Sequence, residues 1–172
     1  MMNRRAATLL TMSAALAAVL FTAEARPTTR YIWNASDSVP VGLYRVMPIR
    51  ELFVTELVAV HAPEPLAAFL DEAGYLPHGV PMLKRVLALP GQTACRHGEV
   101  ITIDNIEMGR AHQHDSRSRR LPVWQGCHVI ADNEVFLMNW QSANSLDGRY
   151  FGVLPATAII GVAKPVWTDE EN

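Results

Sequence analysis

The chain contains 172 residues, 49% of them hydrophobic, with a formal net charge of -2 and a pI near 6.3. This length can bury one good-sized core, so we expect one globular domain. The near-neutral balance argues against nucleic acid as a partner, because nucleic-acid-binding domains carry a concentrated basic face. The short basic run at residues 117–120 follows His112, His114 and Asp115 and is interpreted as a solvated loop.

The N-terminal segment has the composition of an export signal. Arg4 and Arg5 precede an uncharged run at residues 6–23 that is rich in Ala and Leu. This is the form of a secretory signal peptide or of a membrane anchor, and the basic pair places the N-terminus in the cytoplasm. We therefore divide the chain into a signal peptide or anchor at residues 1–25 and an exported domain at residues 27–172.

Two fates of the N-terminal segment remain open. An apolar run of about 18 residues is at the short end of what spans a bilayer, and Ala23-Glu24-Ala25 has the small-x-small form of a cleavage site. A polar loop follows closely, which favours an uncut anchor that holds this loop near the membrane. We expect an inner-membrane protein with its domain in the periplasm, or a soluble periplasmic protein if the segment is removed.

The polar loop at residues 34–44 carries the first candidate for chemistry. Its sequence is Asn-Ala-Ser-Asp-Ser-Val-Pro-Val-Gly-Leu-Tyr, in which Ser38 is followed by Pro40 and Gly42. A serine hydroxyl is a weak nucleophile unless an adjacent base accepts its proton. A nucleophilic role for Ser38 therefore requires a base elsewhere in the chain.

The remaining sequence predicts many short strands and one helix. The helix covers residues 64–74, with Pro65 at its start and Gly74 where a C-cap belongs. Asp132 and Asn133 predict the turn of a hairpin. Short strands with a single helix indicate a mostly β domain of coiled antiparallel sheets. The predicted strands or extended segments cover residues 28–33, 43–47, 56–61, 82–89, 92–95, 99–103, 128–131, 134–139 and 161–167.

The two cysteines fit an exported domain. Cys95 and Cys127 enclose a loop of about 30 residues, and a disulfide there would stabilise the fold by roughly 3 to 4 kcal/mol in an oxidising compartment. Two buried free thiols are the alternative. A catalytic cysteine is disfavoured, because neither residue has neighbours that would lower a thiol pKa.

Lys84 is the candidate base. Strand alternation places it on the same face as Met82 and Val86, while Arg85 points the other way. Burial favours a neutral lysine, and lowering its pKa from about 10.4 to between 7 and 8 takes roughly 4 kcal/mol, which apolar burial can supply. The alternative is that Lys84 faces solvent on an edge strand and Arg85 faces an acid inside.

Three stretches of the sequence match a known pattern in order and spacing. They are Ser38-Val-Pro-Val-Gly-Leu-Tyr44, Leu83-Lys-Arg-Val-Leu-Ala-Leu-Pro-Gly91 and Asn144-Ser-Leu-Asp-Gly-Arg-Tyr-Phe-Gly152. Together they resemble the signature boxes of the serine/lysine-dyad signal peptidases. The Ser-x-Pro-x-Gly-x-Tyr form is most similar to the conjugative-transfer branch, the TraF-type peptidases that mature pilin precursors. The resemblance runs from about residue 34 to residue 152.

The resemblance implies a signal-peptidase fold and a peptidase activity of the exported domain. It implies that Ser38 is the nucleophile and Lys84 its general base, with no cofactor or metal. Ser36 matches the position whose hydroxyl joins the Ser38 backbone N–H in holding the oxyanion, and such a donor is worth about 3 kcal/mol or more. The alternative for Ser36 is a loop serine that bonds its own backbone.

The third stretch matches residues that support the site. Ser145 matches the position that hydrogen-bonds and orients the lysine amine, and Asp147 with Arg149 matches a pair that braces the site. Gly148 replaces the more usual serine. Val39 and Pro40 directly after the nucleophile differ from the general signal peptidases, which carry Met and a further residue before Pro, and this supports the conjugative branch.

The implied reaction is cleavage or transfer of a peptide bond on a small-residue precursor held at or exported across the membrane, such as a pilin. Attack on the acyl-enzyme by water gives a linear product, and attack by the substrate's own amino terminus gives a cyclic one.

Other interpretations fit parts of the sequence. A zinc site at His112, His114 and Asp115 is disfavoured, because the segment is polar and loop-like. A Ser-His-acid triad would need His61 or His128 near the serine. A LexA-like self-cleaving repressor uses the same chemistry but lacks an export segment. A non-enzymatic, membrane-tethered assembly module would have no use for a buried lysine.

Overall fold

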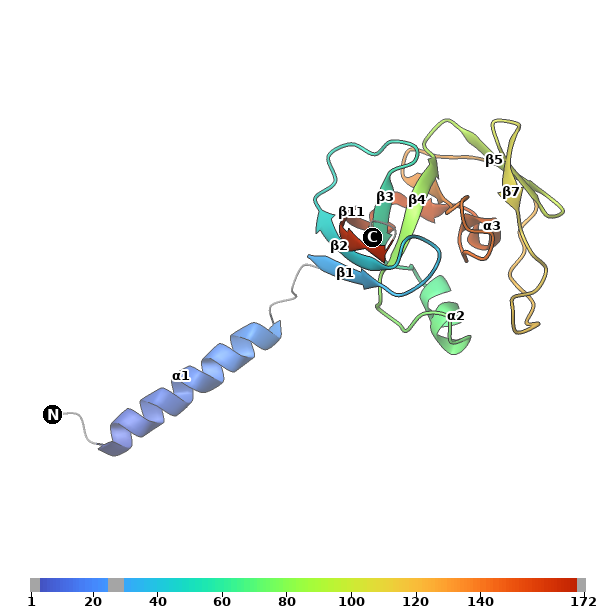
Figure 1. The fold of residues 1–172 in the computed structure, drawn as a ribbon. Coiled ribbons are helices and arrows are strands. Elements are labelled where there is room, and N and C mark those ends of the chain that lie inside the picture. The colour runs from blue at the N-terminus through green and yellow to red at the C-terminus, as the bar shows by residue number, and fades with distance from the viewer. Residues whose placement is uncertain (1–3, 25–29, 170–172) are drawn as a thin grey trace.

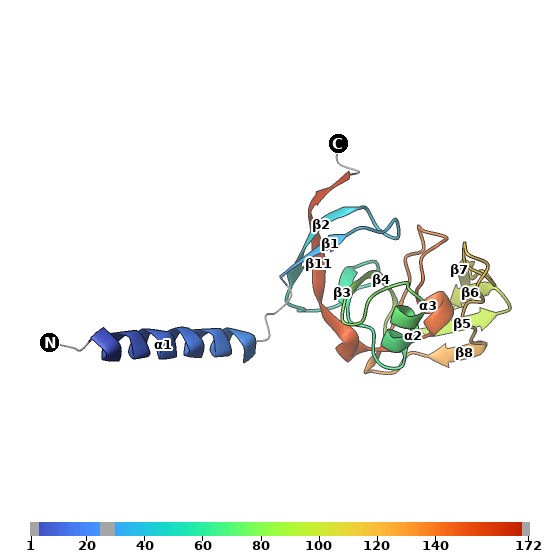
Figure 2. The same ribbon diagram turned by 90° about the horizontal axis from the view of Figure 1, so that it is seen from below.

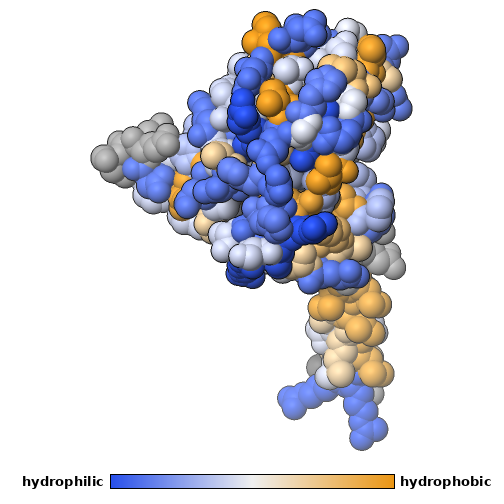
Figure 3. All heavy atoms as spheres, turned by 90° about the vertical axis from the view of Figure 1, so that its right-hand side faces the viewer, coloured by the Kyte–Doolittle hydropathy of each residue, from blue (hydrophilic) through white to orange (hydrophobic). Residues whose placement is uncertain are grey.

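The computed structural model describes residues 4–24 and 30–169. Helix α1, Arg4–Glu24, forms over the uncharged N-terminal run and lies outside the β domain in both ribbon views (Figures 1 and 2). Its apolar side chains are exposed, including Leu9, Met12 and Leu16. In Figure 3 they surround the helix below the domain.

No helix in the described ranges, α1 included, is long and apolar enough to cross a membrane. The α1 sequence is rich in alanine and includes Thr8, Thr11 and Ser13. Ala25, which completes the small-x-small sequence, lies outside the described residues.

A seven-stranded antiparallel sheet forms the main body and carries the first two sequence boxes. Its edge begins with the β1–β2 hairpin, and β11 pairs with both β2 and β3. The sheet is strongly curled around the core (Figures 1 and 2). In spatial order its strands are β1 Tyr31–Asn34, β2 Gly42–Met47, β11 Ile159–Thr168, β3 Leu57–Val60, β4 Met82–Ala88, β9 Glu134–Leu137 and β10 Leu154–Pro155.

A second, four-stranded sheet follows β4 and extends to one side of the body (Figure 1). Cys95 and Cys127 are directly opposite each other in this sheet and are joined by a disulfide. In spatial order its strands are β7 Ile106–Arg110, β6 Val100–Ile103, β5 Thr93–His97 and β8 Gly126–Val129.

Short helices close the ends of the core. Helix α2, Leu66–Glu72, lies within the predicted helical segment, and its Leu70 belongs to the same buried apolar cluster as Val58 and Val86. The one-turn helix α3, Gly148–Phe151, and the 3-10 turn η1, Ala156–Ala158, were not predicted. The expectation of a mostly β domain with curled antiparallel sheets is confirmed.

The predicted hairpin across residues 132–133 is wrong. The strand before this turn, β8, pairs with β5, whereas the strand after it, β9, pairs with β4 and β10. The chain changes sheets at Ile130, which is 2% exposed and still exchanges backbone hydrogen bonds with residues 91 and 92. Burial of this side chain between the sheets separates the two strands that the turn signal would have joined.

Candidate active site

The loop between β1 and β2 is organised by Asn34, which is nearly buried at 9% exposure. Its side-chain Nδ2 donates to three carbonyl oxygens of the loop, those of Ser36 at 2.8 Å, Val39 at 2.9 Å and Pro40 at 3.1 Å. The Tyr44 hydroxyl also donates to the Pro40 carbonyl, at 2.7 Å. A loop whose carbonyl groups are satisfied in this way holds the serine between them in one conformation.

Ser38 lies in a short chain of hydroxyl groups within this loop. The Ser36 Oγ donates to Asn34 Oδ1 at 3.0 Å and lies 3.0 Å from the Ser38 Oγ. With the Ser36 proton directed at Asn34, the Ser38 hydroxyl is the donor to Ser36. Ser36 is therefore adjacent to Ser38, as the sequence pattern predicts, but its proton points away from Ser38.

Lys84 lies in the middle of β4 and is 6% exposed. Its ammonium group donates to the Ser145 Oγ at 3.1 Å. Burial lowers the pKa of Lys84 to about 8; the Asp147 carboxylate raises this pKa and the Arg149 guanidinium lowers it. About a tenth of the lysine is then neutral at pH 7, a far larger share than for an exposed lysine.

Arg85 points away from this interior, as strand alternation predicts. Its Nε donates to Gln141 Oε1 at 3.1 Å and its Nη1 to the Thr55 carbonyl at 3.1 Å. The guanidinium also lies over the Trp140 ring. Of the two neighbouring basic residues in β4, Arg85 thus points toward solvent and Lys84 is buried.

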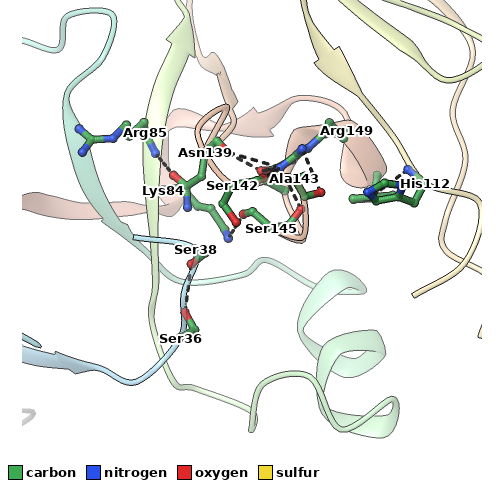
Figure 4. A network of polar contacts seen from close by, with 12 residues as sticks. Ser36, Ser38, Lys84, Arg85, His112, Asn139, Ser142, Ala143, Ser145 and Arg149 are labelled. Carbon is green, nitrogen blue, oxygen red and sulfur yellow. Dashed lines mark hydrogen bonds and ion pairs between the residues drawn. The ribbon is translucent and has the colours of Figure 1, made fainter. Parts of the chain in front are cut away.

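Lys84 and Ser38 both line a cavity of about 570 Å³. In Figure 4 the two side chains lie near each other, with the Ser38 hydroxyl directed at Ser36 and the Lys84 ammonium at Ser145. Among the described residues, Ser38 is hydrogen-bonded to Ser36 and Lys84 to Ser145, with no direct hydrogen bond between Ser38 and Lys84. Catalytic hydrogen bonds are often long in unliganded sites and shorten when substrate binds. The cavity wall is otherwise largely apolar and includes Ile32, Leu70, Leu76, Val80 and Leu146.

Asp147 and Arg149 form a buried ion pair beside the lysine, at 1% and 2% exposure. The guanidinium donates to both carboxylate oxygens at 2.9 Å. Arg149 Nη2 also donates to the carbonyl oxygens of Ser142 at 2.6 Å and Ser145 at 3.2 Å. The pair therefore holds the loop that carries the Ser145 hydroxyl.

Asn139 is a supporting residue that the sequence reasoning missed. Its side chain donates to the Leu83 carbonyl at 3.1 Å and accepts from the Arg85 N–H at 2.9 Å, so it binds the backbone on both sides of Lys84. Its own N–H donates to Asp147 Oδ2 at 3.0 Å. Asn139 thus links the strand of the lysine to the ion pair (Figure 4).

The sequence held only weak signals for these supports. Asn34 follows directly after a predicted extended segment and begins a loop of small polar residues, where an Asn side chain commonly bonds nearby backbone. Asn139 ends an apolar strand, and its partners lie more than 50 residues earlier. The hydrophobic periodicity of a sequence does not predict contacts between residues so far apart in the chain.

The cysteines and histidines lie apart from Ser38. None of the six histidines lines the Ser38 cavity, and His128 is paired with Glu134 at 2.6 Å. Within the described ranges, one group of side chains has the spacing of a metal site, namely Cys95, His97 and Cys127. Its two sulfur atoms are joined in the disulfide.

The sequence matches a defined class of proteins over nearly its whole length. The family model for signal peptidase, peptidase S26, matches residues 3–168, which is nearly the whole chain. The chain belongs to this peptidase family. A crystal structure of a signal peptidase I from Enterococcus faecalis V583 has a TM-score of 0.40 and 16% identity, covering 66% of this chain and 97% of that one.

Within the family, this chain is similar to proteins named for conjugation. It is 35% identical over 150 residues to the conjugal transfer protein TraF of Agrobacterium fabrum, covering 80% of this chain and 82% of that protein. It is 32% identical to the TraF protein of Agrobacterium tumefaciens strain 15955, over 98% of both chains. A probable signal peptidase I-1 from Synechocystis is 31% identical, over 64% of this chain and 52% of its own.

Proposed function

We propose that this chain is a serine endopeptidase that uses a Ser38/Lys84 dyad to process exported precursors, with pilin maturation in conjugative transfer as its role. The observation that carries the proposal is a buried lysine of lowered pKa that lines the same cavity as a serine on a well-ordered, hydrogen-bonded loop. Burying a lysine costs free energy. Perturbed ionisable groups in a cleft are commonly functional, and this cost then has a chemical use.

In the proposed reaction, the neutral Lys84 amine accepts the Ser38 proton as the Ser38 Oγ attacks the scissile carbonyl carbon. The tetrahedral intermediate collapses, the C–N bond breaks, and Lys84 returns the proton to the leaving amine. An ester now joins the acyl group to Ser38. Water or an amine attacks this ester, Lys84 takes the attacker's proton, and the proton returns to Ser38 as the C–O bond breaks.

The oxyanion of the intermediate requires hydrogen-bond donors. The Ser38 backbone N–H and the Ser36 hydroxyl are the proposed donors, which requires the Ser36 proton to turn from Asn34 Oδ1 toward the substrate. The cost of this rotation is one neutral hydrogen bond, about 1 kcal/mol. A donor to a developing negative charge contributes more than that.

The proposed substrate and location follow from the relatives and from the cavity. Relatives covering most of the chain are named for conjugal transfer, which supports a precursor of the conjugation apparatus. The disulfide supports an oxidising compartment such as the periplasm, because disulfides are rare in the cytosol. The largely apolar cavity wall suits small or apolar side chains beside the cleaved bond.

The proposal is tested by co-expression of the full chain with a candidate pilin precursor, followed by mass measurement of the product. Wild type and Lys164→Ala should process the precursor, since Lys164 is the second lysine of the sequence and is exposed. Ser38→Ala and Lys84→Ala should leave it intact. Full processing by either of these two variants would refute the dyad. A product lighter by one water than the linear form identifies cyclisation.

A non-enzymatic assembly module is the main competing function, and Lys84→Arg separates it from the dyad. Arginine stays protonated at working pH, so the peptidase should lose activity. A module whose role is only structural should still assemble with this charge-conserving variant. The Lys84→Arg variant also tests for a self-cleaving repressor. In that case the wild-type chain would cleave itself and the variant would not.

A further inference from the structure

A second cavity, of about 310 Å³, adjoins the Ser38 cavity. Tyr75, Asn144 and Leu146 line both cavities. Asn144 and Ser145 are neighbours in the chain, so the shared wall begins next to the hydroxyl that binds Lys84. The second cavity therefore lies next to the Ser38 cavity, within reach of a substrate bound there.

The outer wall of this second cavity carries two arginines, Arg117 and Arg119, beside His112 and His114. Asp115 is the one carboxylate among its lining residues. The loop that carries them lies on a largely hydrophilic face of the domain (Figure 3). Figure 4 shows His112 on the far side of Arg149 from Ser38.

The Asp115 carboxylate is already paired with neighbouring groups of the protein. Its Oδ2 is 2.6 Å from Arg119 Nη2 and accepts from the Tyr75 hydroxyl at 2.7 Å, and its Oδ1 accepts from the backbone N–H groups of Arg117 and Arg119 at 2.9 Å. The Arg119 guanidinium also stacks on the Tyr75 ring and donates to the Ala73 carbonyl. The loop is thereby fixed against α2 and the wall that both cavities share.

Arg117 is left as the free cation of the cavity. Only its backbone N–H is bound to Asp115, and within the described parts of the chain its guanidinium has no hydrogen bond or ion pair. A guanidinium offers donors in a planar fork that matches a carboxylate. A fixed loop that presents an unpaired arginine beside the substrate cleft is suited to bind an acidic side chain.

We propose that this cavity is a subsite for an Asp or Glu side chain of the precursor, bound by Arg117 at a fixed distance from the cleaved bond. The inference rests on the proposed peptidase function and adds the chemistry that selects the substrate. His112 and His114 complete the wall around the carboxylate. We call the cavity the anion subsite.

Binding to the inactive Ser38→Ala protein tests the subsite without turnover. The probes are alanine-rich peptides in which a single Glu or Gln is moved one position at a time, and affinity is measured by calorimetry. At one or two adjacent positions, the Glu peptide should bind roughly fivefold more tightly than its Gln counterpart, as for a favourable ion pair. This preference should shrink in high salt, which screens the charges.

Arg117→Gln in the same background should reduce the preference to about onefold, whereas Arg110→Gln should retain it, because Arg110 pairs with Glu107 on β7. Arg117→Glu should favour a Lys peptide at the same position, which shows that the variant protein is still folded. Equal binding of Glu and Gln peptides at every position, or equal effects of the Arg117 and Arg110 variants, would overturn the subsite.

Cleavage assays separate failure of the subsite from failure of the peptidase. With the active protein, Arg117→Gln should raise KM for the Glu peptide about fivefold and leave kcat unchanged. If wild type cleaves Glu and Gln peptides with equal KM, the peptidase stands and the subsite fails. If wild type cleaves no precursor while the binding preference persists, the subsite stands and the proposed peptidase fails.

Discussion

Replacement of Lys84 by methionine should stabilise the protein while abolishing the proposed chemistry. The pKa of Lys84 falls from 10.5 to about 8 on burial, so the folded protein binds fewer protons than the unfolded chain at pH values between these two. Stability therefore rises with pH across this interval and is lowest below pH 8. This change in the pKa of Lys84 lowers the free energy of unfolding by about 3 kcal/mol at pH values well below 8.

The magnitude can be divided into two parts. Methionine removes the cost of the buried amine, about 3 kcal/mol near pH 6.5 and about 1 kcal/mol near pH 9.5. It also leaves the Ser145 hydroxyl without its donor, which costs about 1 kcal/mol. The net gain should be about 2 kcal/mol near pH 6.5 and about zero near pH 9.5.

The assay is urea unfolding of the full chain, followed by tryptophan fluorescence, for wild type and Lys84→Met at both pH values. Lys164→Arg is the control, because the Lys164 side chain is exposed and the substitution keeps the positive charge that pairs with the buried Glu56 carboxylate, at 3.6 Å. The control should show no comparable pH-dependent gain. A Lys84→Met protein that is less stable than wild type at the lower pH, or a gain independent of pH, would refute a depressed lysine pKa.

Three further predictions concern activity and the supporting structure. The kcat/KM of precursor cleavage should rise with pH on a limb with its midpoint near 8, where Lys84 loses its proton; a pH profile with no such limb would contradict the lysine base. Asn139→Ala should lower kcat about tenfold with little change in KM, because the strand around Lys84 loses two hydrogen bonds; Asn133→Ala, in an exposed turn, is the control, and equal kcat values for the two variants would argue against positioning. The double variant Cys95→Ser/Cys127→Ser should lose about 3 to 4 kcal/mol of unfolding free energy, measured by urea titration with and without reductant; an unchanged midpoint would show that the bridge does not contribute.

The orientation of Lys84 could be predicted because it depends on local geometry. Residues 82–85 of β4 pair with β3 without a register shift, so the period of two holds and Lys84 and Arg85 face opposite ways. The α2 segment was predictable for a similar reason, since Pro65 and Gly74 flank an apolar helical pattern. The order of the three sequence boxes supplied the rest of the candidate site.

The missed features depend on contacts between distant segments. The pairing of β9 with β4 shifts in register between Val86 and Ala88. Beyond this shift β9 ends, and the Asn139 side chain binds the β4 backbone where further strand pairing would otherwise lie. The separation of β8 from β9 depends on Ile130 entering the core between two sheets. The unpredicted helix α3 follows Asp147, its N-cap residue, whose carboxylate accepts the Arg149 N–H and so caps a single turn.

An acyl-enzyme on Ser38 is the intermediate that the proposed reaction requires. The most direct measurement is acid quenching of the full chain during cleavage of excess precursor, followed by intact mass measurement and peptide mapping. We predict an added mass equal to the acyl fragment, located on the peptide that contains Ser38 and absent from the Ser38→Ala and Lys84→Met proteins. An adduct on another residue, or cleavage by the Ser38→Ala protein, would contradict the account.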